Sequence, residues 1–393
     1  MESIVRFVFS ARSFIIVPFI AVAIAVFGHA ASTHAQPLTQ ADRAFIDTAV
    51  ADAMKDGKKP GVSISVSGPK GSYQKGYGVS NRLTRKALTA NDHFRVGSIT
   101  KTFTAAAILR QVDKGAISLD DTVSKYVSGI PNGNIITVRD LLSMRSGLHE
   151  YTSDIVYQVS LALLPTMPFT PQNAVNIMKK KAPAFAPGTQ YSYANSNYIL
   201  LGLILEKTTG KKVQNVIADE VIKPSGLTNT TFPTNATMPA PYSRGYGPNP
   251  ILSFLVKDYT AINPTVAWTA GAVVSTHADL AKFSKALHGG TLLSPAMQAA
   301  QQNFCPIPHG GEGFPAQAGY GFGMMQLGKW QGHNGSIPGF GSVAFYNPSN
   351  GATITIMTNT WRDDFAVYGK ILPKVVERLY PGSMTTTPTY PNC

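Results

Sequence analysis

The chain has 393 residues, of which 44% are hydrophobic and 14% are charged, and its formal net charge is +13. This length is ample for a large hydrophobic core and predicts roughly two lobes. Two cysteines are too few for a disulfide-stapled scaffold, and no Cys or His spacing is typical of a zinc site. Because no nucleic-acid-binding motif is present either, we expect neither a metal nor a nucleic-acid partner.

Residues 1–35 have the pattern of a signal peptide. Arg6 and Arg12 lie in the leading segment before an uncharged apolar run over residues 14–27, and Thr33-His34-Ala35 offers small residues for cleavage. The run is too short to span a bilayer comfortably, so we expect cleavage after Ala35, no stable membrane anchor, and export to the periplasm or the medium. Outside the cell the basic chain would be attracted to anionic cell-wall polymer, although the same charge also serves solubility.

The first predicted elements are a helix over residues 38–57 and a β-hairpin over residues 62–78. This hairpin contains two of the three Ser-x-x-Lys pairs in the sequence. Ser67 and Lys70 straddle its turn, and Ser72 and Lys75 lie on opposite faces of one strand, so neither pair is suited to joint chemistry.

The third pair, Ser98 and Lys101, begins a helix that the sequence predicts to be buried. Residues 99–112 are apolar on nearly every side, and Gly115 ends the run. Residues three apart share a helix face, and a lysine with little water around it loses proton affinity and can act as a base toward a neighbouring hydroxyl. The simpler alternative is that Ser98 caps the helix and Lys101 is solvated.

The middle of the chain predicts mainly helices, over residues 136–147, within 153–178, and from Ser275 or Thr276 to residues 288–290. Tyr193 and Asn195 lie in a loop before an apolar helix over residues 197–209, from which both could project into a cleft. Alternatively, Tyr193 packs in the core and Asn195 caps the helix. Residues 224–264 are rich in Pro, Gly and Asn and predict a long surface excursion over the site.

The last hundred residues return to strands, with a hairpin turn at residues 348–351 and a closing helix over residues 363–380. His333 and Gly335 share a face of one strand, where a glycine would let a substrate backbone approach closely. A lone strand histidine is more often structural than catalytic, so this motif is weak by itself.

In combination the three motifs are specific. Ser98-x-x-Lys101, Tyr193-x-Asn195 and His333-x-Gly335 occur in this order, within segments such as FRVGSITKTF and PGTQYSYANSNYILLG. The chain therefore resembles the serine β-lactamase-like superfamily, in the branch that holds class C β-lactamases, DD-carboxypeptidases, D-aminopeptidases and related esterases. The resemblance covers nearly all of the chain after residue 35, and the His-x-Gly form is more similar to the carboxypeptidase and D-aminopeptidase members.

The resemblance implies an α/β (α+β) fold. In this fold an antiparallel sheet is flanked by the N- and C-terminal helices, and an all-helical lobe is inserted between its strands. We expect one catalytic domain over residues 36–393, with the α/β lobe at about 36–95 and 310–393 and the helical lobe at about 96–309. The residue pattern agrees, since it predicts strands only near the two ends.

The resemblance also implies roles for the site residues. Ser98 would attack a carbonyl and become acylated, while Lys101 and Tyr193 would move its proton. Asn195 would bind the substrate amide, His333 would orient Tyr193, and the N–H groups of Ser98 and Ser336 would form the oxyanion hole. Further candidates for contacting substrate are Gly335, Asn334 and Trp268. No metal or cofactor is required.

The predicted function is an exported serine hydrolase that forms an acyl-enzyme on small peptides or esters. The resemblance favours a DD-carboxypeptidase or D-stereospecific peptidase on cell-wall-type peptides, with β-lactams as covalent ligands. A carboxylesterase, a β-lactamase and a non-enzymatic penicillin-binding sensor are the alternatives.

Two further expectations concern particular residues. The resemblance places an arginine for a substrate carboxylate after a Tyr-Gly-x-Gly stretch, but here residues 320–323 are followed by Met324 and Met325, which suggests a pocket for an uncharged group. Lys329 and Arg244 are possible substitutes for the missing arginine. Cys305 and Cys393 form a candidate disulfide, because export oxidises thiols.

Overall fold

The computed structural model describes residues 36–250, 252–308, 318–361, 364–388 and 390. The predicted signal peptide and Cys393 lie outside these residues, so cleavage, export and the Cys305–Cys393 bridge stay predictions. Within the described part of the chain, no helix is both long enough and apolar enough to cross a membrane.

An eight-stranded antiparallel sheet forms one half of the domain, in the order β2-β1-β12-β11-β10-β9-β8-β7. Its long central strands come from both ends of the chain, because β1 pairs with β12 as well as with β2. Alternate apolar residues of β1, such as Val62, Ile64 and Val66, are fully buried. The strands are β1 (Gly61–Gly68), β2 (Gly71–Gly78), β7 (Cys305–Pro306), β8 (Gly319–Tyr320), β9 (Met325–Leu327), β10 (Trp330–Ile337), β11 (Phe340–Asn347) and β12 (Ala352–Thr358).

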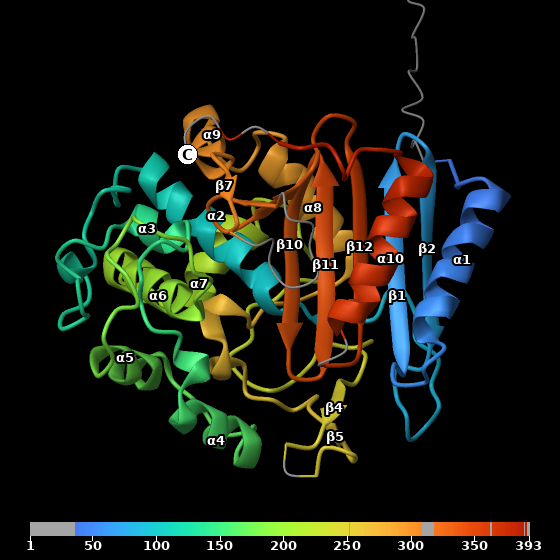
Figure 1. Ribbon diagram of the computed structural model, residues 1–393, viewed down its shortest axis with the longest axis horizontal. Coiled ribbons are helices and arrows are strands. Elements are labelled where there is room, and N and C mark those ends of the chain that lie inside the picture. The colour runs from blue at the N-terminus through green and yellow to red at the C-terminus, as the bar shows by residue number, and fades with distance from the viewer. Residues whose placement is uncertain (1–35, 251, 309–317, 362–363, 389, 391–393) are drawn as a thin grey trace, which may run out of the picture. The chain divides into compact units, whose positions relative to one another are not determined.

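Helices cover both faces of this sheet (Figure 1). The terminal helices α1 (Gln40–Met54) and α10 (Asp364–Leu379) pack together on one face, and α8 (His277–His288) packs against β11 and β12 from the other. Thr39 and Thr276 cap α1 and α8 by accepting backbone N–H groups in the first turn.

A helical lobe lies beside the β10 side of the sheet (Figure 1). Its central helix, α2, buries 11 of its 14 residues and contacts α6. The α-helices of this part are α2 (Thr100–Asp113), α3 (Val138–Leu142), α4 (Ile155–Leu163), α5 (Pro171–Lys179), α6 (Asn195–Thr209), α7 (Val213–Ile217) and α9 (Pro295–Gln301). Short one-turn helices connect them: η1 (Gly97–Ile99), η2 (Val123–Lys125), η3 (Tyr151–Ser153), η4 (Ala218–Ile222), η5 (Pro264–Val266) and η6 (Trp268–Ala270).

The predicted fold class is confirmed, with differences of detail. Two small strand pairs, β3 (Phe94–Arg95) with β6 (Val274–Ser275) and β4 (Tyr246–Pro248) with β5 (Val256–Asp258), lie outside the main sheet. Of these strands, β4, β5 and β6 interrupt the part expected to be all-helical, as does β7 of the main sheet. The helix expected over residues 136–147 is only α3, because Met144 adopts φ +62° and the chain turns there. The segment 224–264 forms the β4–β5 hairpin and loops.

Candidate active site

Ser98 lies in η1, the tight turn that leads from β3 into α2. Gly97 makes this turn possible, because its φ of +51° suits glycine and a Cβ there would lie 2.7 Å from the backbone nitrogen of Ser336. The serine turn therefore packs directly against β10. This contact brings the backbone of Ser336 beside Ser98, as an oxyanion hole made from these two residues requires.

Lys101 is completely buried one turn later, with its Nζ atom at the centre of three hydrogen bonds. Nζ donates to Ser98 Oγ at 2.9 Å, Asn195 Oδ1 at 2.7 Å and the Ala270 carbonyl at 2.9 Å. Burial lowers the pKa of Lys101 to about 7, and the negative charge of Glu150 partly opposes this shift. The alternative in which Lys101 is solvated is wrong.

Tyr193 approaches the same serine from the segment that precedes α6. Its hydroxyl is hydrogen-bonded to Ser98, and its ring centroid lies 4.9 Å from Lys101 Nζ. Although 37% of Tyr193 is exposed, its hydroxyl lies at the crowded centre of the site. Burial therefore raises the pKa of Tyr193 well above its usual value, although the hydrogen bond to Ser98 acts in the other direction. Near neutral pH, Tyr193 carries its proton and Lys101 is the group that changes charge.

Asn195 is the first residue of α6 rather than part of the preceding loop. Its side-chain oxygen holds Lys101, and its backbone N–H donates to the carboxylate of Glu150. The second carboxylate oxygen of Glu150 accepts the backbone N–H of Thr152 at 2.9 Å. Glu150 is thus fixed beside the site from the loop after α3.

His333 is buried on β10, and burial together with the charge of Lys101 lowers its pKa to about 3. The ring is therefore neutral at pH 7. Its Nε2 atom lies 3.3 Å from the Tyr320 hydroxyl, whereas the His333 and Tyr193 rings contact each other with centroids 6.2 Å apart. Nε2 of His333 is thus paired with Tyr320 rather than with Tyr193, and any influence on Tyr193 passes through ring packing.

Gly335 serves a different purpose from the one predicted. A side chain at Gly335 would collide with the Val96 carbonyl and the Ser342 hydroxyl. The glycine therefore lets β10 approach the turn that carries the serine, rather than letting a substrate approach β10. Asn334 faces away from Gly335 along the strand, and its carbonyl contacts Nδ1 of His333.

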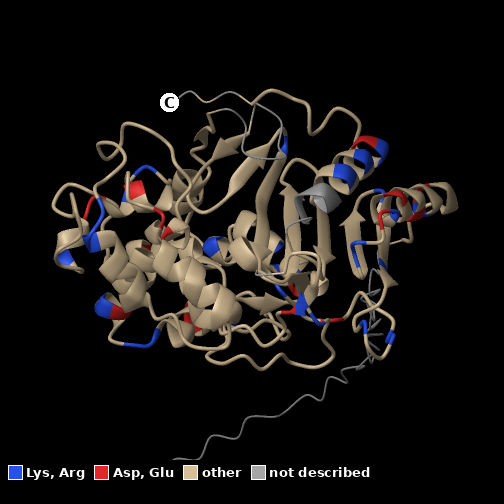
Figure 2. Ribbon diagram, turned by 60° about the horizontal axis from the view of Figure 1, so that its bottom comes forward, with Lys and Arg blue, Asp and Glu red and all other residues tan. Residues whose placement is uncertain are grey.

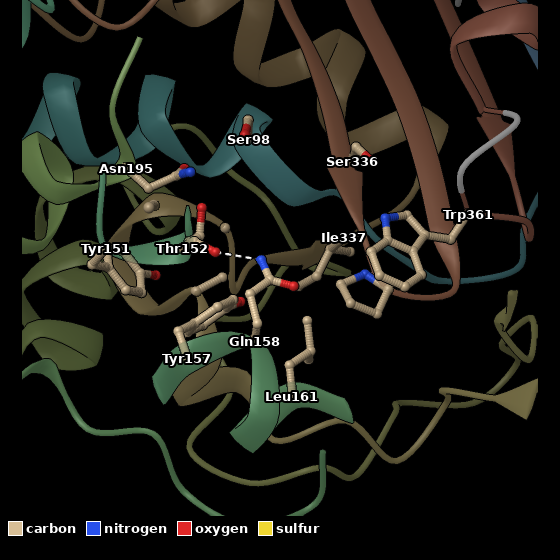
Figure 3. Close-up of a pocket in the computed structure, with 14 residues that line it drawn as sticks. Ser98, Tyr151, Thr152, Tyr157, Gln158, Leu161, Asn195, Ser336, Ile337 and Trp361 are labelled. Atoms are coloured by element: carbon tan, nitrogen blue, oxygen red, sulfur yellow. Dashed lines mark hydrogen bonds between the residues drawn. The ribbon is translucent and has the colours of Figure 1, made fainter. Parts of the chain in front are cut away.

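A pocket of about 290 Å³ opens in front of Ser98 (Figure 3). Ser98 and Asn195 lie on one side of it, Ser336, Ile337 and Trp361 on the sheet side, and residues of η3 and α4 on the opposite side. The described residues that line it are Ser98, Tyr151, Thr152, Tyr157, Gln158, Leu161, Asn195, Ala267, Ala270, Gly271, Ser336, Ile337, Pro338 and Trp361. None of these carries a formal charge.

Several sequence candidates lie outside this lining. The Trp268 ring packs against Gly202 of α6, while φ of +39° at Trp268 shapes the η6 turn that presents the Ala270 carbonyl to Lys101. Met324 and Met325 are buried in the core, so they do not shape the pocket. Arg244 pairs with Asp258 in a separate surface hollow, and Lys329 is exposed.

Three groups of the site were not among the candidates predicted from the sequence. Glu150 is close to Lys101, Tyr320 is the partner of His333, and the Ala270 carbonyl completes the contacts of Lys101. Tyr320 belongs to a stretch that the sequence had singled out, but no local pattern distinguishes Glu150 or Ala270 from ordinary loop residues.

Comparisons with known proteins agree with this geometry. Residues 46–372 match the sequence model of the Beta-lactamase family. The protein PbpX of Bacillus subtilis, whose name assigns it to the penicillin-binding proteins, is 26% identical over 313 residues, which cover 78% of this chain and 71% of PbpX. A D-aminopeptidase of Brucella anthropi is 29% identical over 192 residues, which cover 48% of this chain and 36% of that enzyme.

Among solved structures, a D-stereospecific amidohydrolase from Streptomyces sp. superposes with a TM-score of 0.76 at 31% identity, over 86% of this chain and 98% of that one. The family match spans more than half of the chain and includes all three motifs. The chain therefore belongs to the Beta-lactamase family and is a serine hydrolase of the β-lactamase fold.

Proposed function

We propose that this hydrolase works through an acyl-enzyme on Ser98. The position of Ser98 Oγ supports this proposal, because it lies between Lys101 Nζ and the Tyr193 hydroxyl at the pocket. With a pKa of about 7, a large fraction of Lys101 is neutral at neutral pH and is able to accept the serine proton. Oγ then bonds to the substrate carbonyl carbon, and the oxyanion is held by the N–H groups of Ser98 and Ser336.

The protonated Tyr193 is suited to pass a proton to the leaving group. As the tetrahedral intermediate collapses, the carbon–nitrogen bond breaks, the amine leaves with this proton, and Lys101 restores the proton of Tyr193. Water then attacks the carbonyl carbon of the acyl-Ser98 ester and gives a proton to the same pair. The bond from this carbon to Oγ breaks, the acid leaves, and the pair returns the proton to Ser98 Oγ. Asn195 holds Lys101 through its oxygen, so its amide N–H₂ group remains to contact the substrate acyl side.

The charges around the pocket support one substrate class. Among the described residues, no arginine or lysine lines the pocket, so no cationic side chain is in place there to bind a free carboxylate of the leaving group. Glu150 instead supplies a negative charge close to Lys101, with lone pairs left after its two backbone hydrogen bonds. This arrangement suits a substrate with a free α-ammonium group on the acyl side.

We therefore infer that the protein hydrolyses amides or peptides of N-terminal D-amino acids. The names of two similar proteins, a D-aminopeptidase and a D-stereospecific amidohydrolase, support the D configuration. A DD-carboxypeptidase, an esterase and a β-lactamase remain rival activities of the same serine, and export before action remains part of the proposal.

The test compares four substrates: D-phenylalanine amide, its N-acetyl derivative, L-phenylalanine amide and D-Ala-D-Ala peptide. We expect kcat/KM to be about tenfold or more higher for the free amine than for the acetylated amide, and Glu150→Gln to remove this preference. Asp120→Asn, which removes a carboxylate at the surface, is the matched control. Preferred cleavage of the D-Ala-D-Ala free acid, unaffected by Glu150→Gln, would instead establish a carboxypeptidase.

A further inference from the structure

Exposed apolar side chains gather on one side of the pocket mouth. Among the described residues, 15 large apolar side chains are exposed, and 11 of them belong to three neighbouring segments, with exposed fractions between 45% and 89%. We call these 11 residues the apolar rim: Leu83, Ile155, Val156, Val159, Leu163, Leu164, Met167, Leu252, Phe254, Leu255 and Val256. So strong a clustering of apolar side chains in contact with water marks an interaction site.

The three segments form one surface. Lys257 Nζ in β5 donates to the Ala162 carbonyl in α4 at 3.2 Å, which joins the hairpin to the helix. On the other side of the hairpin, the Tyr246 hydroxyl in β4 accepts the Arg82 N–H at 2.9 Å, beside Leu83. In Figure 1 all three segments lie along the lower edge of the domain.

The rim is basic as well as apolar. Its three segments contain four basic residues and no Asp or Glu. The segments are residues 81–87, 155–167 and 252–257, and the basic residues are Arg82, Arg85, Lys86 and Lys257. The nearest carboxylate of the hairpin, Asp258, is paired with Arg244 at 2.7 Å. Figure 2 brings this edge forward and draws these basic residues in blue.

Helix α4 connects the rim with the active site. Tyr157 and Leu161 line the pocket, whereas Ile155, Val159 and Leu163, spaced four residues apart, point the opposite way into solvent. Whatever covers the rim therefore lies next to the pocket mouth.

We propose that the apolar rim docks on an anionic phospholipid bilayer and holds the pocket mouth at the lipid surface. Protruding Leu and Phe side chains enter the headgroup–acyl boundary, and the four cations attract anionic headgroups. A second copy of the chain fits less well, because a two-fold contact through this rim would bring the same cations together without carboxylates to pair them. The inference does not depend on the proposed substrate.

The experiment places a tryptophan reporter in the full chain, as Phe254→Trp, with Ile135→Trp as the control at an exposed apolar position outside the rim. Each variant is mixed with vesicles of phosphatidylcholine containing about 30% phosphatidylglycerol, with bromine on the acyl chains. We expect the added fluorescence at position 254 to shift to the blue and to be quenched, while the fluorescence at position 135 does not change. Vesicles of phosphatidylcholine alone should bind at least about tenfold more weakly.

A second variant set keeps the result decisive. Replacing Leu83, Val159 and Phe254 together by serine should lower vesicle binding by about tenfold or more, whereas Ile135→Ser should not change it. Equal quenching at positions 254 and 135 would show attachment through another part of the chain, such as residues 1–35, and would overturn the proposal. Unquenched fluorescence at position 254 would also overturn the proposal. A dimer that is seen in analytical ultracentrifugation and lost in the triple variant would overturn it as well, because it would assign the rim to a second copy of the chain.

Discussion

At the catalytic centre polar side chains lie inside the protein, whereas on the apolar rim apolar side chains lie in solvent. Lys101, His333 and the hydroxyl of Tyr193 are buried, and each has a specific hydrogen-bond partner. Leu163 and Phe254 are exposed by 58% and 81%. Both placements cost folding free energy relative to the reverse arrangement.

The difference shows what each region gains from that cost. At the catalytic centre burial changes chemistry, because it brings the pKa of Lys101 down to about 7 and keeps Tyr193 protonated. On the rim, no pKa is involved, and exposure only makes apolar surface accessible to another molecule. Substitutions should therefore alter reactivity in the first region and association in the second.

The largest expected effect is on the paired groups of the catalytic centre. Lys101→Ala and Tyr193→Phe should each lower kcat by about 10²- to 10⁴-fold, because both act on the proton of one hydroxyl. For the same reason, the double variant should be scarcely slower than either single one. Steady-state kinetics with circular dichroism checks this, and Lys59→Ala, at the other buried lysine in the described chain, serves as the control. Additive losses would show that the two groups act separately.

Next in size is the pH dependence that burial of Lys101 imposes. Because only the neutral amine accepts the serine proton, kcat/KM should fall about tenfold for each pH unit below the pKa near 7. Glu150 raises the pKa of Lys101, so Glu150→Gln should move this acid limb to lower pH. A limb that shifts upward, or a rate independent of pH between 5 and 7, would contradict the assignment of Lys101 as base.

His277 is a buried polar residue away from the pocket, so it tests whether burial alone makes a group contribute to catalysis. His277 hydrogen-bonds Ser63 at 2.8 Å and Thr355 at 2.6 Å, and burial lowers its pKa to about 3 from an ordinary 6.5. Since the unfolded chain binds the proton first as pH falls, His277 should make stability decrease below pH 6.5, by up to about 1.4 kcal/mol per pH unit.

The measurement is urea unfolding at pH 7 and pH 5. His277→Gln should narrow the stability difference between the two pH values while kcat at pH 7 stays within about twofold of the wild type. An unchanged difference would show that His277 is not the group that links stability to pH.

The smallest expected effect is on the stability of the rim. Leu163→Ala should change the free energy of unfolding by no more than about 0.5 kcal/mol, because its side chain is already in water. Leu161→Ala, two residues earlier on the inward face of α4, should cost about 2 kcal/mol or more. Comparable losses in urea unfolding would mean that Leu163 is packed against the protein and that the rim is not exposed.

Local patterns were enough to predict much of this molecule. The apolar run after Ser98 predicts buried α2, Gly115 ends that helix in a left-handed conformation, and the alternation in residues 62–78 predicts the first hairpin. The three motifs converge because the elements that carry them pack against one another, with Ser98 in η1, Asn195 at the start of α6 and His333 within β10. Family resemblance supplied the order in which these elements come together.

Interactions between distant segments were not predictable in this way. Glu150 belongs to the site only because its carboxylate accepts the Asn195 N–H, 45 residues later in the chain. The role of Gly335 depends on the Val96 carbonyl, and the position of Trp268 depends on a glycine in α6. The rim is assembled from a loop, a helix and a hairpin whose separate sequences show no common periodicity.

The central claim is that Ser98 is the nucleophile, and covalent labelling tests it most directly. The wild-type chain is incubated with a fluorophosphonate or a β-lactam and its intact mass is measured, together with the masses of Ser98→Ala and of Ser67→Ala, which alters another Ser-x-x-Lys pair. We predict a single adduct on the wild type and on Ser67→Ala, mapped to the peptide that contains residues 97–101, and none on Ser98→Ala. Labelling that persists in Ser98→Ala would contradict the account.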